Sequence, residues 1–137
     1  MNINKKITHL IVYLFIFFII SSCGNAAENK SYQNIDTKQA VELIKNKQTL
    51  ILDVRTLGEY TQGHIKNSFL IPVQVLTTEH IKIMDHKDNP ILIYCRSGNR
   101  SVTASNILTK NGFKKLYNLK GGIKDWIKNG LPIEKQP

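Results

Sequence analysis

Residues 90–101 read PILIYCRSGNRS, and this stretch decides both the fold and the chemistry that the chain can support. The apolar run 90–94 predicts a buried central strand, and residues 101–111 carry apolar side chains at helical spacing. The loop between them is short, cationic and contains one glycine; its residues are Cys95, Arg96, Ser97, Gly98, Asn99, Arg100 and Ser101. The pattern predicts a strand that delivers one thiol into a loop at the beginning of a helix.

This setting favours a reactive thiol. Backbone N–H groups in such a turn, together with the positive end of a helix, favour an anion at the centre of the loop. Arg96 and Arg100 add two positive charges. Because these conditions lower the pKa of a cysteine, Cys95 is expected to be a thiolate nucleophile near neutral pH. The alternative is that Cys95 is only a small buried side chain, but a packed thiol gains nothing from an anion-binding loop.

Strands alternate with helices along the flanking sequence. Apolar residues 49–54 predict a strand buried on both faces, and shorter strands are predicted at 69–71 and 116–119. Helices are predicted from an Asp36 cap with Gln39 in a capping box to about Asn46, at residues 57–62 and 75–84, and after Gly121-Gly122. This order implies an α/β fold with parallel strands and right-handed crossovers. Ligands of such sheets bind outside the carboxyl ends of the strands, where Cys95 falls.

Four segments, in order, carry a family resemblance. The segments CRSGNRS (95–101), LDVR with EY and GHI (52–65), SFLIP (68–72) and LKGGIKDW (119–126) resemble elements of single-domain rhodaneses, which are thiosulfate or polysulfide sulfurtransferases. Ser68 stands where that family more often has alanine, a small-for-small change. The resemblance implies a single rhodanese-like domain with a five-stranded, mostly parallel sheet and helices on both faces.

The resemblance also implies a reaction. The Cys95 thiolate would take the outer sulfur of a small anionic donor, thiosulfate or polysulfide, as a persulfide and pass it to a cyanide or thiol acceptor. Arg96 and Arg100 would bind the donor, and the loop from Arg96 to Ser101 would form the substrate site. Cys95 and Arg100 are separated by four residues, and in this superfamily the one-residue-longer loop accompanies phosphatase chemistry. A persulfide carrier and a non-catalytic binding module remain the alternatives.

Other polar residues are expected to be structural. We expect His64 to cap or pack, and Asp53 and Arg55 to form contacts near the site. His80 and His86 lack ligand-like neighbours in the sequence, so no metal site and no cofactor are predicted.

The amino-terminal residues indicate export. Residues 1–22 contain two lysines, an apolar run and a small-residue end, the pattern of a signal peptide. ISSC at 20–23 resembles a bacterial lipobox, which implies lipidation of Cys23 and attachment of the protein to a membrane in the cell envelope. Polar residues 23–34 are expected to be a tether, and 35–137 the folded domain.

The chain is basic, with a formal net charge of +9. The lysines are scattered without interleaved aromatic residues, so a solvated surface is favoured over a nucleic-acid interface. We expect a monomer that has no nucleic-acid partner.

Overall fold

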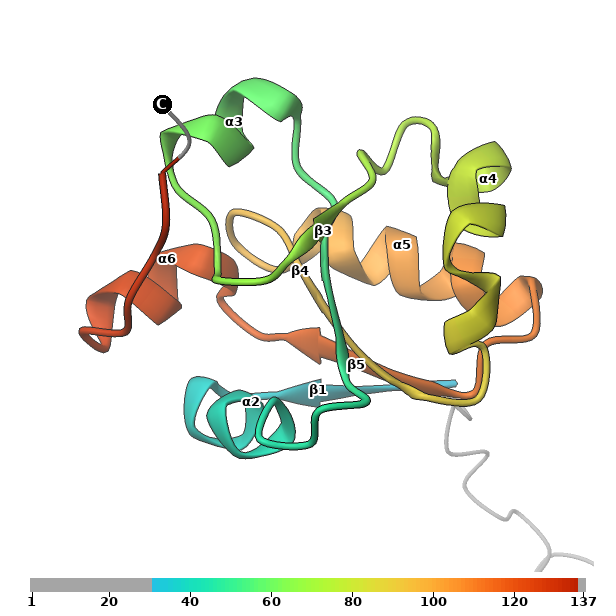
Figure 1. Cartoon of the computed structure of the whole chain (residues 1–137), viewed down its shortest axis with the longest axis horizontal. Coiled ribbons are helices and arrows are strands. Elements are labelled where there is room, and N and C mark those ends of the chain that lie inside the picture. Colours follow the sequence, from blue (N-terminus) through green and yellow to red (C-terminus); the bar gives the residue numbers. More distant parts are fainter. Residues whose placement is uncertain (1–30, 136–137) are drawn as a thin grey trace, which may run out of the picture.

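Five strands form one sheet in the computed structural model, which describes residues 31–135. They are β1 (Tyr32–Ile35), β2 (Leu50–Asp53), β3 (Phe69–Leu70), β4 (Pro90–Tyr94) and β5 (Lys115–Leu119). Their order across the sheet is β1-β5-β4-β2-β3, and every pairing is parallel. The predicted five-stranded α/β fold is confirmed, and β4 lies at the centre of the sheet (Figure 1).

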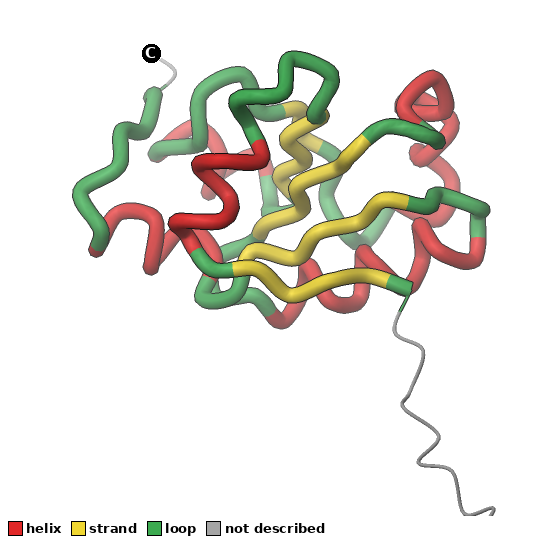
Figure 2. The backbone as a smooth tube through the Cα atoms, turned by 90° about the horizontal axis from the view of Figure 1, so that it is seen from below, coloured by secondary structure: helices red, strands yellow, loops and turns green. Residues whose placement is uncertain are grey.

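Helices cover both faces of the sheet (Figures 1 and 2). They are α2 (Thr37–Leu43), α3 (Leu57–Gln62), α4 (Leu76–Glu79), the 3₁₀ helix η1 (His80–His86), α5 (Asn99–Lys110) and α6 (Gly122–Lys128). One hydrophobic core lies between the sheet and α4, η1 and α5. A second core lies between the opposite face and α2 and α6.

The position of β4 in the fold explains why its residues are apolar at successive positions and not only at every second one. Ile91 and Ile93 belong to the core under α5, whereas Leu92 and Tyr94 belong to the core under α6. All four residues have no exposed surface. A parallel strand covered by helices on both faces needs apolar side chains in both directions, and residues 90–94 provide them.

Side-chain caps fix where two helices begin. Asp36 and Gln39 form the predicted capping box, with the Gln39 N–H 2.8 Å from Asp36 Oδ1. Thr56 and Glu59 form a second box at the start of α3. Each box satisfies backbone N–H groups that have no partner inside the helix. Helix α3 ends at Gln62 as predicted, but α2 ends at Leu43, before the predicted boundary near Asn46.

Two further sequence predictions differ from the structure. The predicted tether ran to residue 34, but Tyr32–Ile35 forms β1 and pairs with β5. Gln33 and Asn34 are polar and exposed on this edge strand, so the segment lacks the apolar signal of a buried strand. The helix predicted at 75–84 is instead α4, which ends at Glu79, followed by the 3₁₀ helix η1, and η1 is itself kinked at Ile83, where φ is −120° and ψ is 17°.

The predicted signal peptide and Cys23 lie outside the described residues. Within residues 31–135, none of the helices is long and apolar enough to cross a membrane.

Candidate active site

Cys95 lies directly after β4, at the carboxyl end of the central strand. Only 1% of the residue is exposed. The Gly98 N–H donates to Sγ at 3.1 Å, and the Ser101 hydroxyl lies 3.5 Å from the same sulfur. Gly98 has a left-handed φ of 100°, which costs glycine little, and α5 begins at the next residue, two positions earlier than predicted. The predicted strand, loop and helix are therefore present, and the loop closes around the sulfur.

The loop favours the thiolate form of Cys95. Burial raises the pKa of Cys95, but the Ser101 hydroxyl and the backbone N–H groups of Ser101, Ser97 and Gly98 lower it by more. The resulting pKa lies below the ordinary value of a cysteine. Hydrogen bonds to the charged form stabilise that form, and here they outweigh the cost of removing it from water. A buried thiol surrounded by N–H donors that favour its charged form is suited to nucleophilic attack.

Helix α6 holds the other side of the loop. The Ile123 N–H donates to the Cys95 carbonyl at 2.9 Å, and the Lys124 N–H donates to the Arg96 carbonyl at 3.2 Å. In a trans peptide the carbonyl and the following N–H point in opposite directions. The N–H of Ser97 therefore points away from α6, and it is one of the groups that lower the pKa of Cys95. Contacts with α6 thus orient one of the donors that surround the sulfur, the Ser97 N–H.

Arg100 is tied to α3 by a bidentate ion pair. Its Nη1 and Nη2 lie 2.7 Å and 2.6 Å from the two carboxylate oxygens of Glu59. Hydrogen bonds from Arg100 lower the pKa of Glu59 to about 2. The pKa of Arg100 is raised by Glu59 and, more weakly, by the charge of Cys95. Arg100 therefore lies in the electrostatic environment of the thiol, but its guanidinium is already paired with Glu59, a contact that the expectation of Arg100 as a donor-binding residue did not include.

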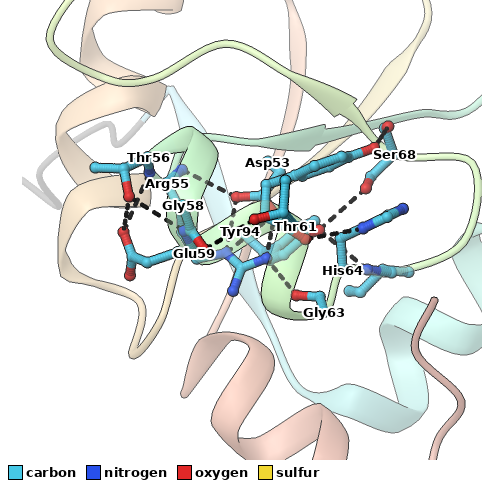
Figure 3. Close-up of polar contacts among 12 residues, drawn as sticks. Asp53, Arg55, Thr56, Gly58, Glu59, Thr61, Gly63, His64, Ser68 and Tyr94 are labelled. Atoms are coloured by element: carbon cyan, nitrogen blue, oxygen red, sulfur yellow. Dashed lines mark hydrogen bonds and ion pairs between the residues drawn. The ribbon is translucent and has the colours of Figure 1, made fainter. Parts of the chain in front are cut away.

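A buried polar network supports α3 beside the loop (Figure 3). Arg55 donates to Asp53 from Nε and Nη2, and Nη2 also donates to the Gly63 carbonyl at 2.8 Å. Tyr94 receives the Ile65 N–H and lies within hydrogen-bond distance of Ser68. Because the network joins β2, β4 and the end of α3, it fixes the helix that carries Glu59. The structural role predicted for Asp53 and Arg55 is confirmed.

His64 also has a structural role in the described contacts. Its ring stacks on Tyr60 with a centroid separation of 3.8 Å, and Nδ1 lies 3.0 Å from the Tyr60 carbonyl. The prediction that His64 caps or packs is therefore confirmed. Among residues 31–135, no group of three or more potential ligands could hold a metal ion.

A groove of about 280 Å³ lies beside the loop. Its lining is mixed and combines isoleucines from α6 and the carboxyl-terminal segment with residues of α3, of the segment between β2 and α3, and of the Cys95 loop. The lining residues are Arg55, Glu59, Gln62, Gly63, Arg96, Ile123, Lys124, Ile127 and Ile133. The groove therefore reaches the residue that directly follows Cys95.

The predicted loop residues divide into two sets. Ser97, Gly98 and Ser101 direct hydrogen-bond donors to the sulfur, whereas the side chain of Arg96 lines the groove. Asn99 is exposed and begins α5. Sequence reasoning did not identify Glu59 or Lys124 as site residues, although both lie in the segments that carry the family resemblance. Their positions could be inferred from those segments, but their contacts with the loop arise only in the folded chain.

Comparison with known proteins agrees with this architecture. A sulfurtransferase of Allochromatium vinosum is 37% identical over 91 residues, which cover 66% of this chain and 83% of that protein. A tRNA uridine(34) hydroxylase of Pelagibacter ubique is 40% identical over 106 residues, which cover 76% of this chain but 35% of that protein. A crystal structure of a rhodanese-related protein from Thermoplasma volcanium has a TM-score of 0.66 and 34% identity, covering 75% of this chain and 98% of that one.

The family model described as rhodanese-like domain matches residues 36–129, which is well over half of the chain and contains β2 to β5, the Cys95 loop and α6. This match, the parallel sheet and the thiol loop at the end of β4 place the protein in one family: it belongs to the rhodanese-like domain proteins.

Proposed function

We propose that the protein is a sulfurtransferase that carries a sulfane sulfur as a Cys95 persulfide. The observation that supports this most directly is the ring of donors around Sγ, with the Gly98 N–H at 3.1 Å and a pKa of Cys95 below its ordinary value. A thiol that only packs in the core has no need of such donors. Relatives named as sulfurtransferases, such as that of Allochromatium vinosum, support the same reaction class.

In the first step the Cys95 thiolate attacks the outer sulfur of thiosulfate. A bond forms between Sγ and that sulfur, the sulfur–sulfur bond of the donor breaks, and sulfite leaves with the electron pair. A polysulfide would react in the same way and leave one sulfur shorter. The N–H groups of Ser97, Gly98 and Ser101 then stabilise the terminal sulfur of the persulfide as they stabilised the thiolate.

In the second step an acceptor attacks the outer sulfur of the persulfide. Cyanide leaves as thiocyanate, and a thiolate leaves as its own persulfide, while the bond to Sγ breaks and the Cys95 thiolate returns. A persulfide carrier would use the same intermediate but hand the sulfur to a partner protein. A binding module would not form the intermediate at all. No nucleic-acid partner and no oligomer are part of the proposal.

The intact mass of the purified protein, measured after incubation with thiosulfate, tests the proposal. We expect the gain of one sulfur atom, its loss on addition of cyanide, and no gain in Cys95→Ser. Rapid turnover with cyanide would support an enzyme, and slow turnover after stoichiometric loading would support a carrier. An unchanged mass in the folded wild-type protein would exclude both readings and leave the binding module.

We also propose that Cys23 is lipidated and holds the domain at a membrane of the cell envelope, because ISSC at 20–23 resembles a lipobox. In Cys23→Ser, we expect an unprocessed precursor or release from the membrane fraction. Unchanged size and unchanged detergent-phase partitioning would exclude lipidation.

A further inference from the structure

The amino ends of the strands lie along one edge of the sheet, and residues 1–30 join the described domain there. Because all pairings are parallel, β1, β4 and β5 begin on the same side of the sheet (Figure 1). Ser31 directly precedes β1, whereas Cys95 directly follows β4. We call the side on which these strands begin the amino edge. Residues 1–30 are therefore connected to the edge of the sheet that is opposite to Cys95.

The number of residues before β1 keeps the amino edge close to a membrane. This inference rests on the proposed attachment of the protein to a membrane through Cys23. Seven residues, 24–30, separate Cys23 from Ser31. An extended chain spans at most ~3.6 Å per residue, so Ser31 stays within about 30 Å of a lipidated Cys23. An unprocessed precursor would be attached through its apolar residues 10–20, which also precede β1, so the same edge would be held near the membrane.

Three lysines form a basic cluster on the amino edge: Lys87, Lys114 and Lys115. The Lys114 N–H donates to the Lys87 carbonyl at 3.3 Å, so the turn before β4 contacts the turn before β5. Lys115 pairs in register with Pro90, the first residue of β4. Lys114 and Lys115 are exposed, and Lys87 is half-buried. The parallel sheet thus gathers lysines that precede two different strands.

The amino edge keeps a positive charge despite two nearby carboxylates. Asp88 pairs with Lys114 at 2.8 Å, and these side chains are 72% and 71% exposed. Because water screens such an exposed pair, Lys114 can also bind a phosphate. The other carboxylate, Asp85, lies on η1, and Lys110 at the end of α5 adds a fourth lysine. Residues 83–89 and 110–115 together contain four lysines and two aspartates, which leaves a net charge of +2.

Exposed apolar side chains border the basic cluster. Ile81 and Met84, both on η1, are 67% and 39% exposed. The Lys87 N–H donates to the Met84 carbonyl at 3.0 Å, so η1 ends at the cluster. Surfaces that combine lysines with exposed apolar side chains are suited to the boundary between lipid head groups and acyl chains. The amino edge has this combination.

We propose that the amino edge docks on anionic lipid head groups of the membrane to which the domain is attached, so that Cys95 faces away from that membrane. The lysines of the cluster contact lipid phosphates, while Ile81 and Met84 enter the head-group region. One lysine near an anionic surface strengthens binding roughly fivefold. Because the domain is already attached, this modest attraction is sufficient to orient it. Sulfur donors and acceptors then reach the Cys95 loop from the aqueous phase.

Acetylation of lysines on the full-length protein tests the docking. The protein is reconstituted into vesicles of phosphatidylcholine, with or without phosphatidylglycerol, and is acetylated so briefly that few molecules react more than once. Mass spectrometry of peptides then gives the reaction rate of each lysine. We expect the basic cluster to react roughly fivefold more slowly on the anionic vesicles than on the neutral ones. Lys120 and Lys124 are exposed and follow β5 at the opposite edge, so each should react equally on both.

Two matched variants assign the effect to the cluster. Lys114→Gln combined with Lys115→Gln should bring the rate at Lys87 on anionic vesicles close to its rate on neutral ones. Lys120→Gln combined with Lys124→Gln removes the same charge from the opposite edge and should leave the protection of Lys87 unchanged. High salt should also remove the protection, because it screens exposed charges.

Equal rates at the cluster on both kinds of vesicle, or equal protection of Lys120 and the cluster, would overturn the docking. A protein that does not remain with the vesicles would refute the membrane attachment and the docking with it. Protection that rises with protein concentration in detergent, without vesicles, would assign the edge to a second copy of the chain instead. Failure to form a persulfide would refute only the proposed sulfur transfer, because acetylation of the lysines does not depend on that reaction.

Discussion

Arg100 offers the sharpest test of how the loop works. Both terminal nitrogens of its guanidinium are occupied by Glu59, at 2.6 Å and 2.7 Å. Arg100 should therefore support the loop from α5 rather than bind the sulfur donor. We expect Arg100→Ala and Glu59→Gln to slow persulfide formation to a similar extent, and the double variant to be no slower than either single variant, because all three break the same contact.

The size of the effect follows from the ion pair. The pKa of Glu59 falls from 4.5 to about 2, chiefly through its hydrogen bonds with Arg100. A change of one in a pKa corresponds to ~1.36 kcal/mol, so a pKa lowered by about 2.5 limits the contribution of this ion pair to about 3 kcal/mol. Both side chains are about one-third exposed, at 32% and 30%, so solvent screening reduces the contribution to about 1–2 kcal/mol. A loop loosened by that free energy should react roughly tenfold more slowly.

The assay compares thiosulfate, which carries two negative charges, with the methanethiosulfonate ion, which carries one. Rates of persulfide formation and urea midpoints are measured for each variant. Asp88→Asn is the control, because the Asp88–Lys114 pair is exposed and lies at the amino ends of β4 and β5, away from Cys95. Faster reaction of thiosulfate in Glu59→Gln, or a loss in Arg100→Ala confined to thiosulfate, would show that Arg100 binds the donor directly and would refute the supporting role.

Three further predictions concern the thiol, acid stability and the contact with α6. The rate of Cys95 alkylation by iodoacetamide, measured against pH, should give a pKa below the ~8.5 of a free cysteine, and Ser101→Ala should raise that pKa by about one. An unchanged pKa in Ser101→Ala would show that the Ser101 hydroxyl donates only to the Gly98 carbonyl, 2.9 Å away. The pKa of Glu59 in the folded protein lies below its ordinary 4.5, so the contribution of Glu59 to stability is complete above pH 4.5 and is lost as the pH falls through about 2. The urea midpoint of unfolding should therefore fall over this pH range, and it should fall less in Glu59→Gln. Gly122→Ala should slow persulfide formation at least tenfold, because the added Cβ would overlap the Cys95 carbonyl. Gly130→Ala is the control, because Gly130 also has a positive φ but lies in open space, so this change should affect stability alone. Equal activities of the two variants would mean that α6 does not determine the conformation of the Cys95 loop.

The sequence predictions that were confirmed depend on patterns among residues that are close together in the chain. The apolar run 90–94, the capping box at Asp36 and the helix over 57–62 each depend on residues within a few positions of one another, and each was confirmed. Strand β1 was missed because its stability comes from pairing with β5, more than 80 residues away along the chain, as the register of Tyr32 with Leu116 shows. An exposed edge strand with polar side chains carries little local signal of its own.

The same distinction applies to the site. Cys95 and the donors of its loop lie within seven residues, so their association was predicted from sequence alone. Glu59 meets Arg100 across 41 positions, and this pairing was not part of the expectation that Arg100 binds the sulfur donor. The groove is likewise a product of tertiary structure, because it combines Arg96 with residues of α3, α6 and the carboxyl-terminal segment. The sequence shows which residues are charged, but it does not show which of them form ion pairs with one another.

The contacts of α6 explain how one loop can serve both states of the sulfur. The carbonyls of Cys95 and Arg96 are held by N–H groups of Ile123 and Lys124, so the orientation of these peptides does not depend on what Sγ carries. The Ser97 N–H, which belongs to the same peptide as the Arg96 carbonyl, consequently remains directed inward whether the sulfur is a thiolate or a persulfide. Such preorganised donors need little rearrangement when charge moves outward from Sγ to the transferred sulfur. The Gly121-Gly122 segment is therefore part of the chemistry, since only a residue without Cβ lets α6 approach the Cys95 carbonyl this closely.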